Sequence, residues 1–334
     1  MPKSDEAFFG RVIADAPAVL TRADVVVGKC LSAGVYASGR LSYPVRCPPG
    51  PYDVRVSFRG QRRLVAPRAW LLPSSAGQAI PERRRDGALA ARLAGLGRAY
   101  PGYAALWVHD LRTGRTAGWN SDTSFPAASI VKLGVLIAAL DRFGPRPERS
   151  SAWADIRAMA TWSANDATNR LVALLGGPRV IQAVLHGVGA TSSTYTGDYR
   201  LGTSVTADTP RPLPILTYRR TTAHDAGRIL YAIHAAALGQ PEAARRTRLS
   251  RHEARVGLAL LLSSARTGDN AGILRPAGPA AQKHGWTTKV RHTAAIVFRK
   301  SGPVIVVVLT FRPDEVSLTA SRALGARVLA ALRG

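Results

Sequence analysis

From about residue 24 to residue 72 the chain consists of short strand-like runs, and in Val54 to Phe58 apolar and polar residues alternate. They predict strands at Val25–Val27, Gly34–Tyr36, Tyr52–Phe58 and Leu64–Trp70. Arg59-Gly60-Gln61 supplies a turn between the last two runs, which indicates a hairpin. We therefore expect a small all-β domain over residues 1–73, followed by a linker over residues 74–85 that is rich in Ser, Gly, Pro and Arg.

From residue 86 onward the apolar spacing becomes mixed. Helices are predicted at 86–100, 128–143 and 316–332, and strands at 103–110, 282–288, 293–299 and 303–311, with helical periods through most of 151–238. Pro126 is expected in the first turn of the second helix, where its missing N–H costs nothing. Strands and helices at both ends of this part thus bracket a helical insertion. The pattern predicts an α/β fold plus an all-α lobe over residues 86–334: an antiparallel sheet flanked by helices, with a helical insertion.

The charge of the chain changes this picture little. The 46 basic and 21 acidic residues give a net charge of +25, which on its own would favour nucleic-acid binding. However, 40 of the basic residues are Arg scattered over the whole chain, and the one run of three, residues 83–85, falls in the predicted linker. We therefore expect no nucleic-acid partner. The most apolar run, Val304–Leu309, is too short to span a bilayer, so we expect no membrane span.

Two cysteines bear on the compartment. Cys30 and Cys47 lie in the predicted β-domain, where a disulfide or two free thiols would both fit, and a disulfide would require an oxidising compartment. The apolar stretch from Val12 to Leu20 is interrupted by Asp15 and Pro17, so it does not predict a secretory signal. The pairing of the cysteines stays open from the sequence.

The first candidate for chemistry is a serine and a lysine three residues apart. Ser129 and Lys132 share one face of a predicted helix N-terminus. A serine hydroxyl becomes a good nucleophile when a neighbour accepts its proton, and a lysine does so when burial or another cation keeps its amine neutral. Arginine cannot do this, and the chain keeps only six lysines beside its 40 arginines. The spacing alone also fits an ordinary surface helix.

Two further groups carry the same kinds of side chain. Ser163-Ala164-Asn165 opens a predicted helix, where Ser and Asn are also common N-caps. Lys283-His284-Gly285-Trp286 lies on a predicted strand, and its glycine would let a substrate approach the backbone closely. Each group alone has an ordinary structural interpretation. The three together match, in order and spacing, the triple motif Ser-x-x-Lys, Ser-Asp-Asn and Lys-Thr-Gly.

Over residues 86–334 the chain therefore resembles the class A β-lactamases and the penicillin-binding serine D,D-peptidases. The resemblance implies that Ser129 is the nucleophile and Lys132 its proton acceptor. Ser163 would pass a proton to the leaving nitrogen, with Asn165 holding the substrate or Lys132. Lys283 would supply positive charge to the site and to a substrate carboxylate. No cofactor and no metal are implied, and the chain shows no zinc or phosphate-loop motif.

The third motif would form the substrate-binding strand, with His284, Gly285 and Trp286 against the substrate. The backbone N–H groups of Ser129 and Trp286 would form the oxyanion hole. Two positions depart from the family pattern. Ala164 replaces the middle Asp of the second motif, and His284 replaces a hydroxyl residue that would bind the antibiotic carboxylate.

A third departure concerns hydrolysis of the acyl-enzyme. In the family's β-lactamases a loop glutamate activates the water, but no Glu occurs here between Ser163 and Glu242. Counting from Ser163 places that glutamate on or beside Tyr199, which makes Asp198 the nearest candidate base. A loop residue that bonds its own backbone is the alternative interpretation of Asp198.

Three functions stay open. The chain hydrolyses β-lactams with turnover, or is a D,D-peptidase-like or other serine hydrolase that releases them slowly, or is a non-catalytic protein that binds or senses the cell wall. We expect the first, a serine hydrolase acting on amide bonds and linked to antibiotic resistance, with a small-molecule β-lactam or peptidoglycan-like substrate. By family habit we also expect a secreted or extracytoplasmic monomer. A Ser-His-Asp hydrolase is disfavoured because no Gly-x-Ser-x-Gly turn occurs.

Overall fold

The structure, a computed structural model, describes residues 81–199, 219–264 and 272–332, and the backbone of four short strands before them. These strands are β1 (Ala23–Val27), β2 (Tyr36–Ala37), β3 (Arg40–Leu41) and β4 (Val54–Phe58). β1 pairs antiparallel with β4, and β2 pairs with β3. The strand predicted at 64–70, its hairpin, and Cys30 and Cys47 lie outside the described residues.

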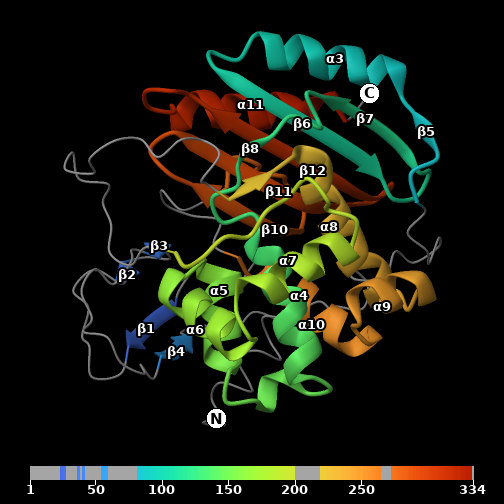
Figure 1. The fold of residues 1–334 in the computed structure, drawn as a ribbon. Helices are drawn as coiled ribbons and strands as arrows, with labels where there is room; N and C mark the ends of the chain where they lie inside the picture. Colours follow the sequence, from blue (N-terminus) through green and yellow to red (C-terminus); the bar gives the residue numbers. More distant parts are fainter. Residues whose placement is uncertain are drawn as a thin grey trace.

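A six-stranded sheet forms the centre of the rest of the chain (Figure 1). Its order is β10 (Ala280–Trp286), β11 (Val290–Arg299), β12 (Gly302–Phe311), β6 (Tyr103–Asp110), β7 (Arg115–Trp119) and β5 (Arg84–Arg85). All neighbours are antiparallel except β5, which runs parallel to β7. The predicted strands are confirmed to within a few residues, and β10 lies at an edge of the sheet.

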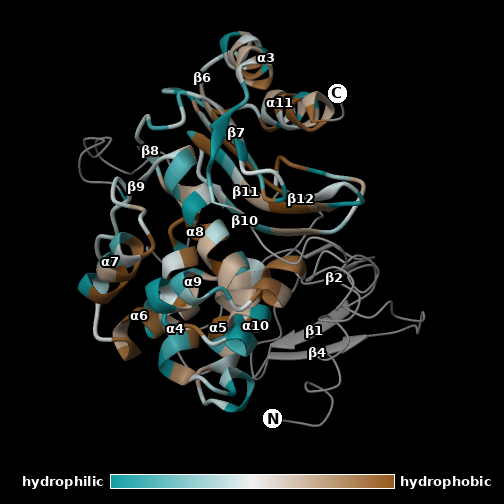
Figure 2. Cartoon of the chain, turned by 90° about the vertical axis from the view of Figure 1, so that its right-hand side faces the viewer, coloured by the Kyte–Doolittle hydropathy of each residue, from teal (hydrophilic) through white to brown (hydrophobic). Residues whose placement is uncertain are grey.

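Helices cover both faces of this sheet, as period-two side-chain alternation requires. Along β12 the buried residues Val304, Val306 and Val308 share a cluster with α3 (Gly87–Arg98) and α11 (Leu318–Ala331). The intervening Ile305, Val307 and Leu309 join the larger cluster on the other face, which includes α8 (Ala223–Ala237). In Figure 2, α3 and α11 lie above the sheet and the remaining helices below it.

The larger cluster lies between this face of the sheet and an all-α lobe below it (Figure 1). Its helices are α4 (Lys132–Phe143), α5 (Trp153–Trp162), α6 (Asn165–Leu174), α7 (Pro178–Gly187), α9 (Pro241–Thr247) and α10 (Arg251–Leu262), with the short 3-10 turn η2 (Pro147–Arg149). The first nine residues of α4 are all buried, so this helix is the axis of the lobe. The predicted fold class is confirmed. In the part of the chain that the structure describes, no helix has the length and apolarity needed to cross a membrane.

One predicted boundary is wrong, and it concerns the segment that carries Ser129. Helix α4 begins at Lys132, not at residue 128, and Pro126 belongs to β8 (Phe125–Pro126), which pairs with β9 (Arg220–Thr221). Ala128 has a φ of 45°, a left-handed conformation that L residues with a Cβ rarely adopt. This residue reverses the chain between the strand and the helix, so the first-turn role predicted for Pro126 does not apply.

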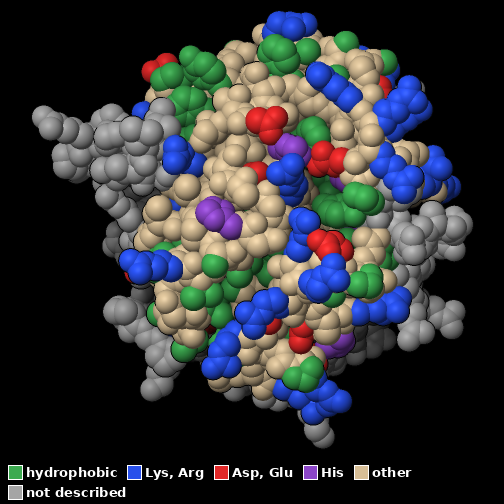
Figure 3. Space-filling model, turned by 45° about the vertical axis from the view of Figure 1, so that its right-hand side comes forward, with side chains coloured by type: hydrophobic (Ala, Val, Ile, Leu, Met, Phe, Trp, Pro, Cys, Tyr) green, Lys and Arg blue, Asp and Glu red, His purple; other side chains and the backbone are tan. Residues whose placement is uncertain are grey.

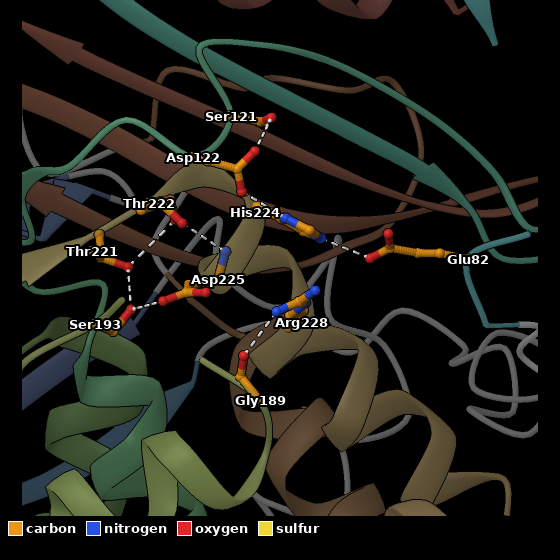
Figure 4. A network of polar contacts seen from close by, with 10 residues as sticks. All are labelled: Glu82, Ser121, Asp122, Gly189, Ser193, Thr221, Thr222, His224, Asp225 and Arg228. Carbon is orange, nitrogen blue, oxygen red and sulfur yellow. Dashed lines mark hydrogen bonds and ion pairs between the residues drawn. The ribbon is translucent and has the colours of Figure 1, made fainter. Parts of the chain in front are cut away.

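A network of polar contacts holds α8 to two distant segments (Figure 4). His224, in the first turn of α8, lies 2.9 Å from the Glu82 carboxylate through Nε2 and 2.8 Å from the Asp122 carboxylate through Nδ1. Burial alone would lower the pKa of His224, but the two carboxylates outweigh it and raise the pKa above 6.5. Glu82 lies just before β5, so these ion pairs connect the segment that enters the sheet to helix α8.

Candidate active site

Ser129 lies in the turn between β8 and α4, half-buried beside the edge strand β10. Its carbonyl accepts a hydrogen bond from the Lys132 amide at 3.3 Å, which places the two residues one turn apart. Gly285 of β10 packs against this turn so closely that a Cβ there would lie 2.8 Å from the Ser129 backbone nitrogen. The first and third sequence motifs therefore meet, although 153 residues separate Lys132 from Gly285 in the sequence.

Lys132 is fully buried and connects the first motif to the second. Its Nζ donates to the Ser163 carbonyl oxygen at 2.7 Å and to Asn165 Oδ1 at 2.7 Å, and it lies 3.5 Å from the Ser163 hydroxyl. Both close acceptors are neutral, so no carboxylate among the described residues forms an ion pair with this amine. The Ser163 carbonyl and the Asn165 amide thus satisfy the hydrogen bonds of the Lys132 amine. They stabilise its positive charge less than a carboxylate would.

Ser163 is held in a left-handed conformation, with a φ of 62°, at the end of α5. The N-cap of the following helix α6 is Ala164, and no side chain caps it. The alternative interpretation of Ser163 and Asn165 as N-caps of the following helix is therefore wrong, since Ser163 is the C-cap of α5 and Asn165 is the first residue of α6. Their side chains instead point to the two lysines, an arrangement that strained backbone at a functional site often supports.

Lys283 approaches the same serine from the sheet. Its Nζ donates to the Ser163 hydroxyl at 2.8 Å and to the His284 carbonyl at 3.0 Å, and the residue is 2% exposed. The Ser163 hydroxyl thus lies between two buried amines from α4 and β10. This convergence of three motifs is the geometry that the resemblance predicts.

The two amines share an electrostatic environment that favours their neutral forms. Burial lowers the pKa of Lys283 to about 7. Burial lowers the pKa of Lys132 well below its usual value, and the charges of Lys283 and Arg219 lower it further. Asp166 acts in the opposite direction on Lys132, but its carboxylate is paired with Arg170 at 3.2 Å. A buried amine without its proton is a base available to a nearby hydroxyl.

The Ser129 hydroxyl makes no hydrogen bond to residues 81–199, 219–264 or 272–332. Lys132 Nζ instead bonds Asn165 and the Ser163 carbonyl. Catalytic hydrogen bonds in free enzymes are often long and tighten when substrate binds. For Lys132 to accept a proton from Ser129, its amine would have to turn toward that hydroxyl from its present partners.

The remaining residues of the third motif differ in their surroundings. His284 is buried, with Nε2 3.4 Å from the Ser264 hydroxyl, so its imidazole contacts the end of α10. Gly285 provides the close approach to Ser129 described above. Trp286 is 42% exposed at the end of the edge strand, with the Arg291 guanidinium 5.3 Å from its ring centroid.

The structure does not bring Asp198 to the other site residues. Its side chain is exposed, and its contact with Arg219 is through the backbone carbonyl, which accepts from the guanidinium at 2.7 Å. The next residue, Tyr199, points inward instead and donates its hydroxyl to the Ala128 carbonyl at 3.0 Å. The side chain that contacts the turn carrying Ser129 is therefore the phenol of Tyr199, not the carboxylate of Asp198.

Tyr199 and its partners were not predicted from the sequence. The Asn169 amide bonds both backbone groups of Tyr199, accepting from its N–H at 2.8 Å and donating to its carbonyl at 2.7 Å. Lys132 Nζ lies 4.2 Å from the Tyr199 ring centroid, and the Arg219 guanidinium lies 3.7 Å from it. Tyr199 comes from an irregular segment without apolar periodicity, and Asn169 is one polar residue among several in α6, so no sequence pattern marks either of them.

Two other classes of site are less well supported. Among the described residues, no group of three or more His, Cys, Asp and Glu side chains could hold a metal ion. On the face seen in Figure 3, Lys and Arg side chains lie in several separate groups among hydrophobic and acidic ones. The convergence on Ser163 remains the best-defined chemical arrangement in this part of the chain.

Comparisons with known proteins bear on the family and the fold of the chain. The family model described as "Beta-lactamase enzyme family" matches residues 88–146 and 144–332. A comparison with curated proteins gives no match. Similar solved structures include PBP-A, which is 20% identical, covers 77% of this chain and 99% of its own, and has a TM-score of 0.59.

Two bacterial β-lactamases show the same fold. The enzyme from Xanthomonas campestris pv. campestris str. ATCC 33913 is 22% identical over 74% of this chain and 96% of its own, with a TM-score of 0.56. That from Desulfarculus baarsii DSM 2075 is 22% identical over 74% and 98%, with a TM-score of 0.58. With the family model matching most of the sequence, the chain belongs to the β-lactamase enzyme family and is a serine hydrolase of the β-lactamase type.

Proposed function

We propose that Ser129 attacks the carbonyl of a β-lactam or a related amide and becomes acylated, with Lys132 as the proton acceptor. The observation that carries this proposal is the convergence of two buried amines on the Ser163 hydroxyl, Lys283 at 2.8 Å and Lys132 at 3.5 Å. Only a neutral amine can take part in proton transfer as a base, and burial together with the charges of Lys283 and Arg219 favours that form for Lys132.

The acylation step follows from these positions. The Ser129 oxygen forms a bond to the carbonyl carbon while its proton passes to the Lys132 amine. The tetrahedral intermediate then collapses, the carbon–nitrogen bond breaks, and Ser163 passes a proton from Lys132 to the leaving nitrogen. Lys283 supplies the positive charge that binds a substrate carboxylate, and Asn165 keeps Lys132 oriented through their 2.7 Å contact.

The negative charge that develops on the carbonyl oxygen needs preorganised donors. We assign these to the backbone N–H groups of Ser129 and Trp286, on the turn and on the edge strand that contact each other at Gly285. One donor of this kind contributes about 3 kcal/mol to transition-state stabilisation. In the part of the sheet that the structure describes, β10 is an edge strand, so an extended substrate can align along its outer side.

Hydrolysis of the acyl-enzyme completes the proposed reaction. No described carboxylate forms a hydrogen bond or ion pair with Ser129, Lys132, Ser163 or Lys283, so a neutral lysine is the base at hand for the attacking water. A variant of PBP-A is known as an acyl-enzyme complex with penicillin G. The alternative is a D,D-peptidase-like enzyme that releases the acyl group slowly. The rate of deacylation distinguishes it from a β-lactamase with turnover.

The test is to incubate the protein with penicillin G, follow ring opening and record the intact mass. The proposal predicts ring opening well above the spontaneous rate, together with an acyl adduct in wild type that Ser129→Ala abolishes. Lys132→Arg keeps the charge but cannot accept a proton, so it should also abolish acylation.

Two exposed positions supply matched controls. Ser151→Ala and Lys300→Arg make the same chemical changes in side chains outside the site, and both should acylate at the wild-type rate. Undiminished acylation in Lys132→Arg would refute the role of Lys132. A stable adduct without sustained ring opening would show penicillin binding in place of turnover. Absence of both the adduct and ring opening would refute the proposal itself.

The same proposal extends to the setting of the enzyme. β-Lactams and peptidoglycan-like amides are met outside the cytoplasm, so we propose a secreted monomer that contributes to antibiotic resistance. Expression in a susceptible bacterium should then raise the penicillin concentration that inhibits growth, and Ser129→Ala should remove the increase. Cell fractionation and light scattering would test the location and the oligomeric state.

A further inference from the structure

Two cationic side chains lie over the ring of Tyr199. Lys132 Nζ is 4.2 Å and the Arg219 guanidinium carbon 3.7 Å from the ring centroid. The ring is fixed in place, because the Tyr199 hydroxyl bonds the Ala128 carbonyl and the Asn169 amide bonds both backbone groups. The relative position of the two cations is thus defined by a rigid, buried side chain.

Arg219 carries its charge without a carboxylate partner among the described residues. Its guanidinium donates to the backbone carbonyls of Asp198 at 2.7 Å and Gly197 at 3.4 Å, and it lies over the Tyr195 ring at 5.5 Å. Backbone carbonyls and aromatic rings orient a guanidinium but do not cancel its charge. The field of Arg219 therefore reaches the amine on the same Tyr199 ring.

We propose that Arg219, stacked on Tyr199, is a positioning residue that keeps Lys132 in its neutral form for proton transfer from Ser129. This inference rests on the proposed function, because it assumes that Lys132 is the base. A charged Lys132 would gain from the aromatic face of Tyr199, as cations do. Arg219 already occupies that ring and repels a second cation there, so it opposes this gain.

The other charges that face Lys132 do not make Arg219 redundant. Lys283 approaches from β10 and acts in the same direction, whereas Asp166 of α6 acts in the opposite direction and is paired with Arg170. The Asp198 carboxylate next to Arg219 is exposed, so water screens it. Arg219 is then the second cation that acts on Lys132, and it is the one that shares the Tyr199 ring with it.

The size of the effect follows from the shared ring. Both charges lie within 4.2 Å of one centroid, so they are at most about 8 Å apart. At the effective dielectric constant of about 20 that describes such sites, the repulsion between two charges at this separation exceeds the thermal energy several-fold. Neutralising Arg219 should therefore raise the pH at which Lys132 loses its proton.

The experiment measures the rate constant for acylation by penicillin G between pH 5 and pH 10. Wild type should show a rate that rises with pH to a plateau as Lys132 loses its proton. In Arg219→Gln and in Arg219→Met the rise should move to higher pH, with the plateau preserved. Arg219→Lys keeps the charge and should restore the wild-type profile.

A matched control and the contrary outcomes complete the design. Arg92→Gln removes one positive charge from the exposed side of α3 and should leave the profile unchanged. If both neutral Arg219 variants acylate with an unshifted rise, or with only a lower plateau, the inference is overturned and Arg219 is merely structural. If wild type forms no adduct at all, it is the proposed function that fails.

Discussion

Gly285 offers a direct test of how closely the edge strand must approach the nucleophile. In Gly285→Ala the new Cβ would lie 2.8 Å from the Ser129 nitrogen, 3.0 Å from the Ala128 Cβ and 3.2 Å from the Ala127 carbonyl oxygen. Ordinary van der Waals contact begins at 3.4 Å, so the turn and the strand must separate by about 0.6 Å. All three contacts are to backbone or Cβ atoms, which cannot rotate away.

That separation would displace the Ser129 N–H from the position at which it stabilises the developing oxyanion. Loss of one such donor costs about 10²- to 10³-fold in rate, and misplacement by less than 1 Å still costs a large part of this. We therefore expect Gly285→Ala to be acylated about 100-fold more slowly than wild type. Its circular dichroism spectrum should match that of wild type, which would show that the fold is intact.

The assay is the rate of penicillin acylation followed by mass spectrometry, with Gly95→Ala as the control. Gly95 lies in α3, and a Cβ there meets nothing within 4 Å. This control should acylate at the wild-type rate and gain up to about 1 kcal/mol of stability from the better helix propensity of Ala. A Gly285→Ala protein that acylates within twofold of wild type would refute the proposed oxyanion geometry.

Three further outcomes are expected. Ser163→Ala removes the hydroxyl between the two amines, so steady-state ring opening should fall about 100-fold or more, and an unchanged rate would exclude Ser163 as proton carrier. Asn169→Ala removes both hydrogen bonds to the Tyr199 backbone and should lower the free energy of unfolding in urea by about 2 kcal/mol. His224→Asn should lower stability most between pH 4.5 and pH 6.5. The carboxyl pKa values of Glu82 and Asp122 are lowered and the pKa of His224 is raised, so the contribution is lost as pH falls through the former or rises through the latter. Thermal melting over this range measures the difference, and a pH-independent difference would contradict the charged network.

Much of the fold could be predicted because its signal is local. Alternating valines in β12 face two different helical layers, and that alternation is visible in the sequence. The start of α4 could not be predicted in the same way. Ala128, with its left-handed φ, follows β8, and β8 pairs with β9 across the chain, Phe125 with Thr221 and Pro126 with Arg220, a long-range contact that local apolar spacing does not reveal.

The site divides in a similar way. The side chains of Ser129, Lys132, Ser163 and Lys283 belong to motifs with fixed spacing, and the structure brings their segments together. Counting along the chain reached residues 198 and 199 but could not decide which of them faces the site. That choice depends on the Asn169 amide, which binds the Tyr199 backbone across 30 residues and turns its ring to Lys132.

The most direct test of the account is to locate the acyl group itself. After brief exposure to penicillin G and digestion, tandem mass spectrometry should find the opened β-lactam on the peptide that contains Ser129, bound to that hydroxyl. In Lys132→Arg the same peptide should be unmodified. An acyl group on Ser163 or on any other residue, or full modification of Ser129 without the Lys132 amine, would contradict the account.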